Sequence, residues 1–270
     1  MSKHTRQDFL GLLKDQDNDV RRRAAEALGE LGNASEPVLQ GLLALLKDQD
    51  NDVRSSVAYV LVKLGNASGP VLQGLLGLLK DQDNDVRRRA AYVLGNLGNA
   101  SEPVLQGLLG LLKDQDNDVR GSAANALGKL GNASEPVLQG LLALLKDQDQ
   151  YVRSNAAEAL GKLGNASEPV LQGLLALLKD QDQYVRANAA CVLGKLGNAF
   201  EPVLQGLLAL LKDQDNDVRG IATEVLGKLG NASEPVLQGL LALLKDQDND
   251  VRSSAAYLLG KLGNASESST

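Results

Sequence analysis

The sequence has very few of the residues on which many enzymes and secreted proteins depend. Among its 270 residues there is no tryptophan, one histidine and one cysteine, and aromatic side chains make up only 3%. One cysteine excludes an internal disulfide, so a reducing compartment is the simplest interpretation. The only histidine, His4, lies in a terminal segment far along the chain from Cys191, so no histidine is placed to activate that thiol. These absences predict a protein that is not an enzyme and has no cofactor.

Long apolar runs and a basic charge are also missing. No run approaches the roughly 18 apolar residues that a membrane-spanning helix needs, and the opening MSKHTRQDFLGLLK has no apolar signal-peptide core. The formal net charge of −6 argues against binding to nucleic acid and to anionic membrane surfaces. We therefore expect a soluble, cytoplasmic protein whose partners include neither nucleic acid nor membrane.

What the sequence does contain is a repeat of 33 residues. The segment DQDNDVR, or its variant DQDQYVR, marks the start of each repeat, and the prolines keep the same interval. The eight repeats start at Asp15, Asp48, Asp81, Asp114, Asp147, Asp180, Asp213 and Asp246. A period without insertions predicts that every repeat contacts its neighbours in the same way, which defines a solenoid.

Each repeat contains the pattern of two antiparallel helices. The segment SEPVLQGLLALLK predicts a first helix, with a serine such as Ser101 at the N-cap, proline in the first turn and a broad leucine stripe. The segment NDVRGSAANALGKL, residues 117–130, predicts a second helix that starts after Asp116 and ends at Gly131. The predicted fold is an all-α solenoid, a right-handed superhelix of eight two-helix repeats.

We predict a single solenoid over residues 1–270, with a capping helix at 1–14, tandem repeats at 15–263 and a C-terminal tail at 264–270. The last second helix is expected to end near Leu262. No further first helix follows it in this sequence, so the pattern also predicts stacking end to end or dimerisation.

The string D-x-D-x-x-V-R-x-x-A-A-x-A-L-G-x-L-G, seen from Asp147 to Gly164 and in most repeats, resembles bacterial HEAT-like repeats of the phycobilisome-lyase type. It is also similar to the artificial α-helical repeat proteins built from that family. The resemblance implies an interaction scaffold whose second helices line a concave binding surface. Because some members handle bilin pigments, it also implies a bilin lyase-like protein as an alternative. The repeats are so alike that recent duplication and deliberate consensus construction both stay open.

The differences between repeats concentrate on one side of the second helix. Counted from the first aspartate of each repeat, they fall mainly at the fifth, eighth, ninth and twelfth positions, beside the apolar stripe on a helical wheel. Tyrosine and arginine, the residues expected at binding hot spots, recur there. The candidate partner-binding residues are Arg22, Arg23, Glu26, Tyr59, Arg88, Arg89, Tyr92, Asn125, Tyr151, Asn155, Glu158, Tyr184, Asn188, Cys191, Ile221, Glu224 and Tyr257.

Neutral drift of an exposed helix face is the alternative explanation for these differences. Drift would also change the outer side of the first helix, around Gln106 and Lys113, yet the equivalents of these residues hardly change. The pattern therefore favours a non-enzymatic scaffold that binds another protein, with a self-assembling module and a bilin-handling protein as alternatives.

The acidic turns raise the question of a metal site. DQDND begins like an EF-hand loop, but valine (Val20, Val53 and their equivalents) stands where that loop needs glycine. We interpret the aspartates instead as helix caps and as charge partners for the arginine of each motif, such as Arg54, which stacking would align in a ladder between repeats. No metal is predicted.

Overall fold

The computed structural model describes residues 3–32, 34–197, 200–230 and 233–267, and within these ranges all regular structure is helical. The first helices of the hairpins are α1 (Lys3–Leu12), α3 (Glu36–Leu45), α5 (Gly69–Leu78), α7 (Glu102–Leu111), α9 (Glu135–Leu144), α11 (Glu168–Leu177), α13 (Glu201–Leu210) and α15 (Glu234–Leu243). The second helices are α2 (Asn18–Glu30), α4 (Asn51–Lys63), α6 (Asn84–Leu97), α8 (Asn117–Leu130), α10 (Gln150–Leu163), α12 (Gln183–Lys195), α14 (Asn216–Leu229) and α16 (Asn249–Glu267). The predicted all-α solenoid of tandem hairpins is confirmed.

The second helices begin and end as the sequence predicts. At α8, Asp116 has extended backbone and its carboxylate accepts a hydrogen bond from the Val119 N–H at 3.0 Å. Gly131 ends the helix with a φ of 68°, a left-handed conformation that glycine adopts without a steric penalty. These two signals fix the helix bounds, and they recur with little change at the other second helices except α16, which lacks the left-handed glycine.

The first helices differ from the prediction in one detail. Ser101 occupies the N-cap of α7, but its hydroxyl makes no capping hydrogen bond. Instead, Oδ1 of Asn99 accepts a hydrogen bond from the Ser101 N–H at 3.0 Å, which closes a turn just before the helix. The asparagine therefore organises the entry into α7.

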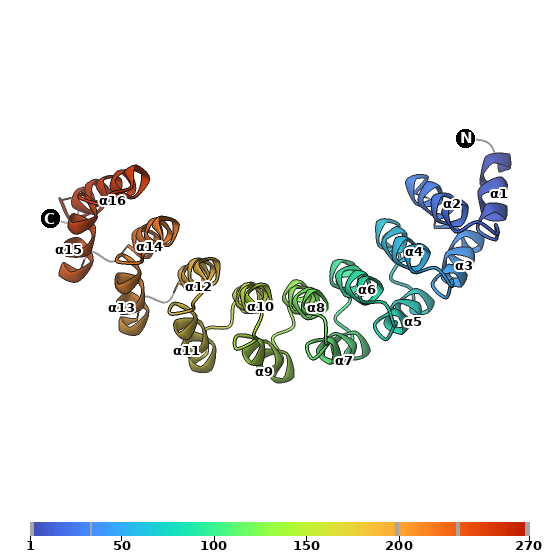
Figure 1. Ribbon diagram of the computed structural model, residues 1–270, viewed down its shortest axis with the longest axis horizontal. Coiled ribbons are helices and arrows are strands. Elements are labelled where there is room, and N and C mark those ends of the chain that lie inside the picture. The colour runs from blue at the N-terminus through green and yellow to red at the C-terminus, as the bar shows by residue number, and fades with distance from the viewer. Residues whose placement is uncertain (1–2, 33, 198–199, 231–232, 268–270) are drawn as a thin grey trace. The chain divides into compact units, whose positions relative to one another are not determined.

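The chain forms two compact units, residues 1–140 and 141–270. Each unit has a layer of first helices and a layer of second helices (Figure 1). Within each unit, neighbouring second helices pack closely against one another, whereas neighbouring first helices make few contacts. Within a unit the second helices therefore form the tighter layer.

Glycines allow this close packing. A Cβ added at Gly107 of α7 would lie 2.7 Å from Cδ1 of Leu79, and one added at Gly95 of α6 would lie 2.7 Å from the Cα of Ala126 in α8. Between the layers, leucines such as Leu108 and Leu127 are fully buried. The core is thus a series of thin leucine and alanine layers, as the shortage of aromatics requires.

Helix α16 is longer than expected, because it runs to Glu267 and not to Leu262. Other second helices end where glycine takes a positive φ, and a proline follows soon after. No proline follows Gly263 in the sequence, and Gly263 itself is helical, so neither stop signal acts. No helix in the described ranges is long and apolar enough to cross a membrane.

Candidate protein-binding surface

The seventeen candidate residues all lie on second helices, and none is buried. We call this set the variable face. In residues 1–140 it comprises Arg22, Arg23, Glu26, Tyr59, Arg88, Arg89, Tyr92 and Asn125, from α2, α4, α6 and α8. In residues 141–270 it comprises Tyr151, Asn155, Glu158, Tyr184, Asn188, Cys191, Ile221, Glu224 and Tyr257, from α10, α12, α14 and α16.

In the first unit, two arginines of the variable face are engaged within their own helices. Nη2 of Arg22 lies 2.8 Å from Oδ1 of Asp19, and its Nη1 lies 3.1 Å from Oε1 of Glu26. Nη2 of Arg88 lies 2.8 Å from Oδ1 of Asp85. These pairs are one turn apart and solvent-exposed, so each contributes only a few tenths of a kcal/mol.

Cations from the next second helix cover the two tyrosines of the first unit. The guanidinium carbon of Arg89 lies 5.5 Å from the ring centre of Tyr59, and Nζ of Lys129 lies 4.9 Å from the ring centre of Tyr92. Both distances fit cation–π contacts. The two rings are accordingly 45% and 43% exposed.

The tyrosines of the second unit are more open. Tyr151, Tyr184 and Tyr257 are 67%, 70% and 72% exposed. When a partner covers a ring that is this exposed, a large apolar surface is removed from contact with water, which favours binding. These three tyrosines are therefore the stronger candidates for anchor residues.

Asn188 and Cys191 of the variable face differ in their surroundings. Nδ2 of Asn188 in α12 donates to the carbonyl oxygen and to Oγ of Ser154 in α10, both at 2.9 Å. This side chain therefore bridges two neighbouring helices. Cys191 is half-buried, and desolvation raises the pKa of its thiol despite the nearby Lys195 and Lys228. The thiol is therefore protonated and a weak nucleophile at neutral pH.

The predicted ladder of arginine and aspartate is present within each unit. Six arginines of the motif, three in each unit, bind the first aspartate of the following repeat through two nearly parallel hydrogen bonds, as for Arg54 Nε and Nη2 to Asp81 at 2.8 Å. Nη1 of Arg54 also donates to the carbonyls of Asp48 and Gln49 at 2.8 and 3.0 Å. The pairs within the two units are Arg21–Asp48, Arg54–Asp81, Arg87–Asp114, Arg153–Asp180, Arg186–Asp213 and Arg219–Asp246.

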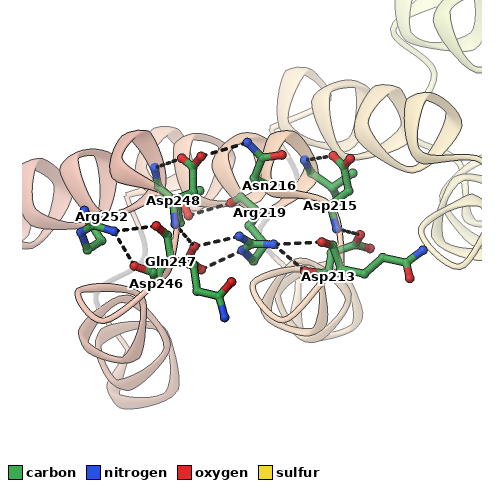
Figure 2. A network of polar contacts seen from close by, with 12 residues as sticks. Asp213, Asp215, Asn216, Arg219, Asp246, Gln247, Asp248 and Arg252 are labelled. Carbon is green, nitrogen blue, oxygen red and sulfur yellow. Dashed lines mark hydrogen bonds and ion pairs between the residues drawn. The ribbon is translucent and has the colours of Figure 1, made fainter.

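Figure 2 shows one such rung, with Arg219 placed between Asp213 and Asp246. The hydrogen bond from Arg219 is the main reason why the pKa of Asp246 lies below its usual value. At Asp81, burial raises the pKa, but the hydrogen bonds from Arg54 and from the Asp83 N–H outweigh it and leave the pKa lowered. The ladder carboxylates are therefore charged in the folded state and already paired with arginine.

A second row of contacts is not among the sequence predictions. Nδ2 of Asn216 donates to Oδ2 of Asp248, the N-cap of the next second helix, at 3.1 Å (Figure 2). Asn18, Asn51 and Asn84 make the equivalent bond to the next N-cap aspartate in the first unit. The recurrence of asparagine at the fourth position of the repeats was the only sequence signal for this row of hydrogen bonds. A contact between side chains 32 residues apart leaves no pattern in the adjacent residues from which it could be predicted.

The sequence also gave no direct indication of a cleft of about 390 Å³ in the second unit. It opens between α12, α14 and α16, at the N-terminal ends of these helices, and Tyr184, Ile221 and Glu224 of the variable face line it. The small residues Ala187 and Gly220, both at the eighth position of their repeats, leave the space open. The volume lies within the range of known ligand pockets.

The predicted capping role of the turn aspartates is confirmed. Asp17 and Asp50 accept hydrogen bonds from the N–H groups of Val20 and Val53. Among the described residues, no group of three or more histidine, cysteine, aspartate or glutamate side chains could hold a metal ion. The side chain of His4 lies outside the described part of the structure.

Comparison with known proteins agrees with this architecture. The family of HEAT repeats matches residues 7–77, 72–161, 112–194, 138–227 and 204–269. A search of curated proteins finds no match. Among solved structures, the crystal structure of an engineered protein is similar with a TM-score of 0.56 and 20% sequence identity, over 95% of this chain and 78% of the other. That likeness supports the fold, and the family matches extend over nearly all of the sequence. The chain therefore belongs to the HEAT-repeat family.

Proposed function

We propose that this protein is a non-enzymatic scaffold that binds another protein through the variable face of its second helices. HEAT-repeat solenoids typically serve as scaffolds for protein interaction. The observation that carries the proposal is the location of the differences: nearly identical repeats diverge on one exposed side of the second helices, where all five tyrosines lie. The tighter packing of the second-helix layer gives that side a close, nearly continuous surface within each unit.

We further propose that the repeats are of the bacterial phycobilisome-lyase type, on the strength of the D-x-D-x-x-V-R string. The surface is concave. The protein works in the cytoplasm, where a single free cysteine such as Cys191 stays reduced.

The alternatives have weaker support. A bilin-handling protein needs a reactive residue or an enclosed pocket, whereas burial raises the pKa of the Cys191 thiol and the described clefts are open to solvent. One observation favours self-assembly: Leu241 and Leu244 of the last repeat are 46% and 39% exposed. Their equivalents one repeat earlier, Leu208 and Leu211, pack beside Gly239, so the exposed pair could pack in the same way against a second copy. Neither alternative uses the tyrosines of the variable face.

The test compares three versions of the full chain. The first is unchanged, and the second carries Tyr59→Ala, Tyr92→Ala, Tyr151→Ala and Tyr184→Ala. The third, a matched control, carries alanine at four exposed glutamines of the first helices, Gln73, Gln106, Gln139 and Gln172. A partner captured from cell extract is purified, and its affinity for each version is measured.

We expect the tyrosine variant to bind at least tenfold more weakly and the glutamine variant to bind like the unchanged chain. Circular dichroism and the denaturation midpoint establish that both variants are folded. A folded tyrosine variant with unchanged affinity, or an equal loss in the glutamine variant, would refute the proposal.

A further inference from the structure

The cleft between α12, α14 and α16 contains two carboxylates that no side chain in the described part of the chain contacts. Asp217 and Asp250 occupy the fifth position of their repeats and line the cleft. Among the described residues, neither carboxylate makes a hydrogen bond or an ion pair. Their neighbours Asp215 and Asp248, in contrast, are N-caps and accept hydrogen bonds from Val218 and Val251 N–H groups.

In other copies of the repeat, the aspartate at the fifth position pairs with an arginine of its own helix when one is present. In repeats one and three an arginine follows at the eighth position, and Asp19 and Asp85 at the fifth position pair with Arg22 and Arg88 at 2.8 Å. In the cleft the eighth position holds Gly220 in repeat seven and serine in repeat eight. In the cleft, as in repeats two and four, no arginine at the eighth position is available to pair with the fifth-position aspartate.

The tyrosine that lines the cleft, Tyr184, has a counterpart elsewhere in the protein that contacts an arginine. In the first unit, Arg89 of one second helix lies over the ring of Tyr59 on the preceding one, 5.5 Å from its centre. Tyr184 lines the cleft, is 70% exposed and has no such cation over it among the described residues. A guanidinium that entered from outside would find both a ring face and a carboxylate there.

The base of the cleft suits the rest of an arginine side chain. Ile221 is half-buried and Val251 is buried, so the cleft has an apolar floor below its charged rim. The three methylenes of arginine can cover such a floor while the guanidinium stays at the rim. Glu224, also at the rim, adds further negative charge, and its one ion pair among the described residues is a long one of 3.8 Å with Lys228.

We infer that this cleft binds an arginine side chain of the partner protein, with Asp217 and Asp250 as carboxylate acceptors and Tyr184 as the stacking surface. The inference rests on the proposed function, since it names the chemistry of the partner at one part of the variable face. Arginine fits better than lysine, because its planar fork of N–H donors can bind a carboxylate in bidentate fashion and stack on a ring at the same time.

The test uses the full chain and the peptide acetyl-Gly-Arg-Gly-amide, which presents one arginine side chain. Binding is measured by isothermal titration calorimetry. A second peptide carries citrulline, the neutral near-isostere of arginine, in place of the arginine, and a third carries lysine.

Two double variants provide the matched comparison. Asp217→Asn with Asp250→Asn removes the cleft carboxylates. Asp52→Asn with Asp118→Asn changes net charge equally at the fifth position of repeats two and four, which also lack an arginine at the eighth position. Tyr184→Ala removes the aromatic wall.

We expect the citrulline peptide and the Asp217/Asp250 variant each to show at least tenfold weaker binding. The lysine peptide and Tyr184→Ala should each bind about three- to tenfold more weakly, and the Asp52/Asp118 variant within twofold of the unchanged chain. Equal binding of the citrulline or lysine peptide, an equal loss in the Asp52/Asp118 variant, or no effect of Tyr184→Ala would overturn the inference. If the tyrosine variants still lose the protein partner in that case, the scaffold proposal stands and the arginine site alone fails.

Discussion

Arg219 binds Asp246 of the following repeat through two hydrogen bonds of 2.7 Å, from Nε to Oδ2 and from Nη2 to Oδ1. The side chains are only 14% and 10% exposed. Nη1 of the same arginine donates to the carbonyl of Asp213 at 2.9 Å. One side chain therefore ties the turn of its own repeat to the turn of the next.

Removal of this guanidinium should be costly. Arg219→Met keeps the apolar stem but leaves the Asp246 carboxylate poorly solvated and without its partner, so we expect a loss of about 3 kcal/mol in the free energy of unfolding. Urea denaturation followed by circular dichroism measures it. Arg88→Met removes an exposed pair within one helix and should cost less than about 0.5 kcal/mol. Equal losses in the two variants would contradict the structural role of the ladder.

The ladder also predicts how stability depends on pH. The pKa values of Asp81, Asp213 and Asp246 are lowered in the folded protein, in Asp246 chiefly by the hydrogen bond from Arg219. In Asp81 and Asp213 burial is the largest single effect and raises the pKa, but the arginine and backbone hydrogen bonds and the nearby arginine charges together outweigh it. A lowered folded pKa stabilises the protein above the unfolded value of about 3.9, and this stabilisation is lost as pH falls through the folded pKa.

We therefore expect nearly constant urea midpoints between about pH 7 and pH 5 and a steep fall below about pH 4. Asp246→Asn removes one titrating group, so that variant should be less stable at neutral pH but show a shallower fall in acid. A midpoint that stays unchanged down to pH 2.5 would show that the ladder carboxylates contribute nothing.

Alanine should have opposite effects at two helical glycines. Nothing lies within 4 Å of a Cβ added at Gly110 of α7, so Gly110→Ala should stabilise the protein by about 0.5–1 kcal/mol through higher helix propensity. At Gly95 of α6 the added Cβ would lie 2.7 Å from the Cα of Ala126, a backbone atom that cannot rotate away, so Gly95→Ala should destabilise the protein by about 1–2 kcal/mol. Denaturation midpoints of the two variants decide this, and a change of the same sign in both would be inconsistent with the packing described.

The two groups of tyrosines should also differ in their contribution to binding. Tyr184 is 70% exposed, whereas Tyr92 is 43% exposed and already has Lys129 over its ring. Once a partner is isolated, Tyr184→Ala should weaken binding by tenfold or more, and Tyr92→Ala by less than about threefold. Surface plasmon resonance with each single variant gives the comparison, and the reverse order would place the main contact on the first unit.

Local signals made most of the fold predictable. The N-cap at Asp116 and the left-handed Gly131 are properties of a few adjacent residues, and the structure has both. The error at the end of α16 also has a local cause, because the sequence after Gly263 lacks the proline that stops the other helices. The ladder could be predicted as well, since identical repeats must align identical charges.

The details of the candidate site were less predictable, because they depend on pairs of residues about one repeat apart. A helical wheel places Tyr59 and Tyr92 on the same face as Tyr184. It cannot show that cations from the next second helix, Arg89 and Lys129, cover the first two rings. The cleft likewise requires small residues on two different helices at once. Whether the variable face binds a protein stays a prediction.

The contacts between repeats also bear on how the chain folds. The side-chain hydrogen bonds given above between repeats join residues 27 to 34 positions apart, from the Arg219–Asp246 pair to the Asn188–Ser154 bond. Short loops close at a small cost in entropy, so folding can start at any pair of adjacent repeats and spread in both directions. Low contact order also predicts folding within milliseconds or less. A single damaged repeat would then divide the chain into two independently folding segments and leave the intact repeats on either side folded.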